Sequence, residues 1–164
     1  MNSRTVTLHH AFLDHLESVV DDSVSTVILY RDACSYQNRN VTLSSALIHF
    51  AVSRRKTIFQ KFLEKRHTWM EVQSVHSAIK GKLKGRHIFW PAEYIDVITA
   101  ARRDHPYEVK QVDHTFFRDF SKVNYLSSIC PRSSAGDRQV VDLQCMQYLL
   151  DGLVSYKINY TDQW

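Results

Sequence analysis

The sequence has few of the residues that interrupt or cross-link small domains. Four glycines and three prolines are too few for a low-complexity linker or a disordered tail. The three cysteines, Cys34, Cys130 and Cys145, are odd in number, widely spaced and outside any C-x-x-C pattern. We therefore expect neither a disulfide framework nor a structural zinc site, and reduced thiols fit an intracellular chain.

Long apolar runs are also missing. No stretch approaches the roughly 18 apolar residues that span a bilayer. The N-terminal residues lack the continuous apolar segment of a secretory leader. We therefore expect no membrane partner and a cytoplasmic or nuclear location.

Recognisable catalytic and cofactor motifs are scarce as well. The run from Lys80 to His87 has the composition of a phosphate-binding loop, but Arg86 follows Gly85 where a Walker loop requires a lysine. No histidine or cysteine spacing marks a metal site. The sequence predicts no cofactor and no bound metal, and a non-catalytic role is favoured over an enzymatic one.

The size and composition suit a single globular domain. The chain has 164 residues, of which 44% are hydrophobic, and such a chain buries roughly two-thirds of its unfolded surface. No repeat or linker divides it, so residues 1–164 are expected to form one domain. Because the chain ends soon after its last predicted strand, it would also suit an excised domain or a fragment of a longer protein.

The hydrophobic pattern predicts an α+β fold, with a helical N-terminal half packed on a small antiparallel sheet that includes a C-terminal β-hairpin. Helices are expected at residues 6–20 and 43–66, from the capping box of Thr68 and Glu71, and from Pro91; strands are expected at residues 24–30, 107–112 and 123–130. Asp113 is expected to cap a short helical turn.

The best local signal lies near the end of the chain. Asp151 and Gly152 separate two alternating runs, which is typical of a tight hairpin turn. Val141, Leu143 and Cys145 should then share one face of the first strand. This predicts the C-terminal β-hairpin.

The charge is concentrated in one segment. Residues 54–86 contain ten Lys or Arg and two acids, so they carry +8 while the rest of the chain sums to −4. The ten cations are Arg54, Arg55, Lys56, Lys61, Lys65, Arg66, Lys80, Lys82, Lys84 and Arg86. On a shared helical face they would attract a polyanion by releasing its counterions. Trp69, Phe89 and Trp90 lie nearby and could stack on bases.

These observations predict a non-catalytic module that binds nucleic acid, DNA or RNA, or another polyanion with little sequence preference. One alternative is a protein-interaction or structural subunit whose basic face meets an acidic protein surface. A second alternative is a metal-dependent nuclease, in which Glu108 and Lys110 share a strand face and Asp96 supplies another carboxylate. Arg55, within an apolar helical stripe, either reaches the surface, marks a helix break near Ser53, or points at an anion in a cleft.

Overall fold

The computed structural model describes residues 3–32, 39–63, 71–116 and 139–164 of the chain. They belong to two compact units, which are described separately: unit 1 comprises residues 1–68 and 117–164, and unit 2 comprises residues 69–116. The expected single domain stays a prediction. The strand expected at residues 123–130 lies outside the described residues.

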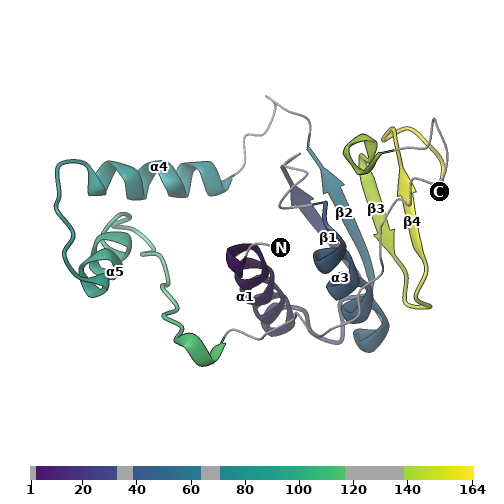
Figure 1. Ribbon diagram of the computed structural model, residues 1–164, viewed down its shortest axis with the longest axis horizontal. Helices are drawn as coiled ribbons and strands as arrows, with labels where there is room; N and C mark the ends of the chain where they lie inside the picture. Colours follow the sequence, from purple (N-terminus) through teal and green to yellow (C-terminus); the bar gives the residue numbers. More distant parts are fainter. Residues whose placement is uncertain (1–2, 33–38, 64–70, 117–138) are drawn as a thin grey trace. The chain divides into compact units, whose positions relative to one another are not determined.

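The described residues of unit 1 combine the helices α1 and α3 with a four-stranded sheet, so the predicted α+β class is confirmed (Figure 1). Its elements are α1 (Ser3–Val19), β1 (Thr26–Arg31), α3 (Val41–Arg54), β2 (Thr57–Phe62), the 3-10 turn η2 (Val140–Asp142), β3 (Cys145–Tyr148) and β4 (Val154–Lys157). The strands lie in the order β1-β2-β3-β4. The sheet is mixed rather than wholly antiparallel as predicted, because β1 and β2 are joined through α3 and run parallel, whereas the β2–β3 and β3–β4 pairs are antiparallel.

The core of unit 1 lies between the two helices and one face of the sheet. Leu16 of α1 and Leu47 of α3 are buried with Ile58 of β2 and with Met146 and Tyr148 of β3. Strand registers place Ile58 opposite Tyr148, so these side chains point to the same face. The opposite face of the sheet carries the alternate residues of each strand.

The predicted helix over residues 43–66 is wrong from Arg55 to Leu63, and its last residues, 64–66, lie outside the described residues. Asn40 caps α3 by accepting a hydrogen bond from the Leu43 backbone N–H at 2.9 Å. The helix ends where Arg55 adopts the left-handed conformation, with φ 53°. The chain then continues as β2, in which burial alternates with a period of two. The expected helix break near Ser53 is therefore close to the observed one.

The predicted C-terminal hairpin is confirmed. β3 and β4 pair antiparallel, and Gly152 lies in the turn with φ 89°. The prediction is wrong at the start of the first strand: β3 begins at Cys145, and Val141 lies in η2. The capping box of η2, formed by the side chains of Gln139 and Asp142, closes a turn before the strand starts.

Unit 2 contains two helices and a 3-10 turn: α4 (Glu71–Leu83), α5 (Pro91–Thr99) and η1 (His114–Phe116). Pro91 occupies the first turn of α5, as predicted. Asp113 caps η1, also as predicted, because its carboxylate accepts hydrogen bonds from the backbone N–H and hydroxyl of Thr115. The strand expected at residues 107–112 is wrong, since this segment has no regular secondary structure.

Within the described ranges, no helix combines the length and the apolar character that crossing a lipid bilayer requires.

Candidate nucleic-acid interface

The ten cations of the basic segment are divided between the two units. Arg54, Arg55, Lys56 and Lys61 belong to unit 1, Lys80, Lys82, Lys84 and Arg86 belong to unit 2, and Lys65 and Arg66 lie outside the described residues. The segment is not a continuous helical face, because β2 occupies residues 57–62. That the cations of the two units share one surface stays a prediction.

Lys56 has a structural position. Its side chain is only 5% exposed. The ammonium Nζ donates hydrogen bonds to the backbone carbonyls of Asp21 and Asp22, at 2.9 and 3.0 Å. It thereby ties the turn that follows α1 to the start of β2, and we leave it out of the proposed interface.

The last turn of α4 brings cations to the surface of unit 2. Lys80 and Lys82 lie in that turn, and the side chains of Lys84 and Arg86 are also exposed. Gly85, with φ 75°, lets the chain leave the helix while the Arg86 backbone N–H donates to the carbonyl of Leu83 at 3.0 Å. Residues 80–87 contain no acid. We call Lys80, Lys82, Lys84 and Arg86 the α4-end cluster.

Aromatic side chains follow this cluster directly. Phe89 and Trp90 are 78% and 70% exposed. The rings of His87 and Phe89 lie with their centroids 6.4 Å apart. Exposed rings of this size next to cations differ from ordinary surface composition, because most large aromatic side chains are buried in a core.

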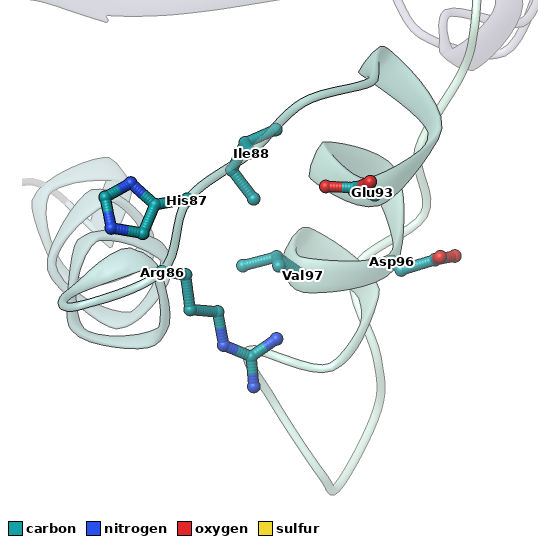
Figure 2. A pocket seen from close by; sticks show the side chains of 6 residues that line it. All are labelled: Arg86, His87, Ile88, Glu93, Asp96 and Val97. Atoms are coloured by element: carbon teal, nitrogen blue, oxygen red, sulfur yellow. The ribbon is translucent and has the colours of Figure 1, made fainter.

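A shallow pocket of about 330 Å³ lies between the end of α4 and α5. Figure 2 shows Arg86, His87 and Ile88 on one side of it and the α5 residues on the other. Glu93 accepts a hydrogen bond from the Phe89 backbone N–H at 3.1 Å, which fixes the chain entering α5. The carboxylate of Asp96 points away from Arg86 in the same view. Both acids that line this pocket, Glu93 and Asp96, lie on α5. The α4-end cluster itself contains only cations.

The residues of the nuclease alternative lack the expected arrangement. Glu108 and Lys110 lie in the irregular segment before η1, so no strand face brings them together. The ammonium of Lys110 instead lies 5.6 Å from the ring centroid of Phe116. Asp96 is on α5. Over the described parts of the chain, no group of three or more His, Cys, Asp or Glu side chains is placed to hold a metal ion.

Lys61 lies on the face of the sheet opposite the helices of unit 1. Lys157 of β4 shares that face, because both residues pair with Cys145 of β3. Trp164 packs against it as well, with its ring centroid 5.4 Å from that of Phe59. Lys157 and Trp164 were not among the site residues predicted from the sequence. The period of two in β4 was the available signal for Lys157, whereas the contact of Trp164 depends on how the chain returns after β4.

Comparison of the chain with protein-family models, with curated proteins and with solved structures finds no match.

Proposed function

We propose that this chain binds nucleic acid without catalysis and with little sequence preference, and that it does so through the α4-end cluster and the aromatic residues that follow it. The observation that carries the proposal is the conjunction of four exposed cations with the exposed rings of Phe89 and Trp90. Cations neutralise phosphates along a strand, while exposed rings stack on unpaired bases irrespective of sequence. The proposed ligand is therefore a single strand.

Helix electrostatics alone gives a weaker explanation of the cluster. Cations in the last turn of a helix interact favourably with its dipole, which accounts for Lys80 and Lys82. Lys84 is still at the helix end, since its backbone N–H donates to the carbonyl of Lys80 at 3.2 Å. The dipole effect falls off beyond the last turn, so it explains Arg86 poorly. It also gives no reason for Phe89 and Trp90 to remain in water. A nucleic-acid strand would use both the cations and the rings.

A salt titration tests the electrostatic part of the proposal. Four phosphate contacts predict that log affinity falls against log salt with a slope of about −3 for a single strand. Binding of a labelled mixed-sequence single strand and of a duplex should be measured by anisotropy at several salt concentrations. The single strand should bind more tightly than the duplex, because only unpaired bases can stack. Flat salt dependence, or no binding at low salt, would contradict the proposal.

Variants at Phe89 and Trp90 test whether stacking on aromatic rings contributes to binding. Replacing Phe89 and Trp90 by leucine keeps apolar side chains but removes the stacking surface, so single-strand affinity should fall by about tenfold or more. Tyr107→Leu, also in unit 2 but only partly exposed, serves as the control and should leave affinity unchanged. If the Phe89 and Trp90 variant bound the single strand as tightly as the wild type while preferring an acidic protein, the protein-interaction alternative would replace the proposal.

A further inference from the structure

The face of the unit 1 sheet opposite its helices carries a row of ionisable side chains. Tyr30 pairs with Lys61, Lys61 pairs with Cys145, and Cys145 pairs with Lys157. Residues directly opposite on neighbouring strands point to the same side of a sheet. The row therefore places a small cysteine between two lysines, each on an adjacent strand.

This spacing suits an anionic group above Cys145. Neighbouring strands lie about 4.8 Å apart, so the backbones of Lys61 and Lys157 are separated by about 10 Å. Two flexible ammonium groups that start from this separation can approach one phosphate from both sides, with Cys145, which is only 2% exposed, forming the floor between them. Burial raises the pKa of the Cys145 thiol, while the positive charges of Lys61 and Lys157 act in the opposite direction.

Apolar and aromatic side chains complete a pocket at the same place. Its volume is about 270 Å³, and Cys145 and both lysines line it together with Ile28, Phe59 and Trp164. Phe59 and Trp164 meet at an angle of 59°. The pocket is slightly smaller than the usual range for ligand sites, which begins at about 300 Å³, so it suits one nucleotide rather than a dinucleotide cofactor.

Both lysines now lie against aromatic rings. The Nζ of Lys61 is 5.7 Å from the centroid of Tyr30, and the Nζ of Lys157 is 4.3 Å from that of Trp164. A nearby carboxylate is Asp162, which accepts hydrogen bonds from the backbone N–H groups of Ile158 and Asn159. These hydrogen bonds and the positive charge of Lys157 lower the pKa of Asp162, so a phosphate would compete with this carboxylate for Lys157.

We propose that this pocket binds one nucleotide unit, with the phosphate between the ammonium groups of Lys61 and Lys157 and the base against the apolar wall of Ile28, Phe59 and Trp164. A phosphate matches the paired cations, and a planar base matches the aromatic and aliphatic wall. The unit is either a free nucleotide or one residue of a strand, since both present the same phosphate and base. The site goes beyond the proposed function, because it lies in unit 1 and needs no residue of the α4-end cluster.

Amide shifts in NMR spectra of the full chain test this site. Adenosine monophosphate should shift the amides of Ile28, Cys145 and Lys157 in a saturable manner, whereas adenosine and inorganic phosphate, which each supply half of the contacts, should bind more weakly. A short single-stranded oligonucleotide separates the two sources. If the oligonucleotide shifts the same amides at a lower ligand concentration than the mononucleotide does, the ligand is a strand. If only the mononucleotide shifts them, the ligand is a free nucleotide. No shift of these amides with either ligand overturns the proposal.

Variants separate this site from the proposed function. Lys61→Gln combined with Lys157→Gln should weaken mononucleotide binding at least tenfold, because both charged contacts to phosphate are lost. Lys82→Gln combined with Lys84→Gln removes the same charge from the α4-end cluster and should leave mononucleotide binding unchanged. Trp164→Leu, at a half-exposed side chain, should weaken binding without loss of charge and decides the matter if the double variant does not fold. Unchanged affinity in Trp164→Leu and in a folded Lys61 and Lys157 variant would refute the site, even if the α4-end cluster binds nucleic acid.

Discussion

The hydroxyl of Tyr148 on β3 donates a hydrogen bond to the side-chain Oε1 of Gln60 on β2 across 2.8 Å, although the two residues are 88 positions apart in the chain. Both side chains are fully buried. The hydroxyl of Ser44 on α3 lies 2.9 Å from the Tyr148 oxygen and completes the network. A buried polar group is tolerated when it has partners, so these residues fix the helix and both strands in one register.

Removing this hydroxyl should destabilise the fold. Tyr148→Phe leaves the Gln60 oxygen and the Ser44 hydroxyl without that partner inside the core, which should lower the free energy of unfolding by about 1–3 kcal/mol. Urea denaturation measures the loss. Tyr156→Phe on β4, where the side chain is half-exposed, is the matched control and should change stability by less than about 0.5 kcal/mol. Equal effects of the two variants would contradict the buried network.

The same residue predicts a dependence on alkaline pH. Burial raises the pKa of the Tyr148 phenol well above its ordinary value. Because the folded pKa is the higher one, this contribution to stability is complete below about pH 10 and is lost as the pH rises further. Between pH 9 and pH 11 the wild type should lose about 1 kcal/mol more unfolding free energy than Tyr148→Phe. Parallel losses in the two proteins would show that Tyr148 does not titrate in this way.

Lys56 should matter for stability and not for binding. Lys56→Met keeps the apolar stem but removes the hydrogen bonds to the carbonyls of Asp21 and Asp22. The free energy of unfolding should fall by about 1–3 kcal/mol, while the salt dependence of nucleic-acid binding should stay the same. Arg54→Met, at an exposed cation two residues earlier, should change stability by less than about 0.5 kcal/mol. A stable Lys56→Met protein with weakened binding would return Lys56 to the interface.

The end of α3 offers a stabilising substitution. Arg55 has φ 53°, a conformation that costs a non-glycine residue about 1 kcal/mol. Arg55→Gly should therefore raise the free energy of unfolding by about 0.5–1 kcal/mol, after the greater flexibility of glycine in the unfolded chain is subtracted. Arg54→Gly, at the last residue of α3, should instead lower it, because glycine is less favourable than arginine in helical conformation. Thermal denaturation of both variants measures the difference in sign, and destabilisation by both would contradict the assigned helix end.

The sequence predicted the elements whose local chemistry and tertiary packing agree. Pro91 began α5, Asp113 capped η1, and the Asp151-Gly152 pair marked the hairpin, because each depends on a few neighbouring residues. Residues 57–62 were wrongly predicted to be helical, because Ile58 and Phe62 fit the apolar stripe of a helix as well as the alternating pattern of a strand. No glycine marks the end of α3 at Arg55 in the sequence. The residues that follow form a strand because they pair with β1 and β3.

The candidate surfaces were predictable from the sequence only where their residues are neighbours in the chain. The α4-end cluster is contiguous in sequence, so composition alone identified Lys80 to Arg86. The row on the sheet face opposite the helices joins Lys61, Cys145 and Lys157 from three strands, and only strand register brings them together. Glu108 and Lys110 match the D/E-x-K spacing of a metal-dependent nuclease only if they lie on a strand. This three-residue pattern is too short to predict that strand.

The central claim is that the charge at the end of α4 binds nucleic acid because of where it lies, and a charge-matched pair of variants tests it most directly. Lys82→Ala with Lys84→Ala removes two cations from the cluster, and Arg102→Ala with Arg103→Ala removes two exposed cations elsewhere in unit 2. Single-strand affinity should fall about tenfold in the first variant, with a salt slope reduced by about 1.4, and should change by less than about threefold in the second. Equal losses in both variants, or none in the first, would contradict the account.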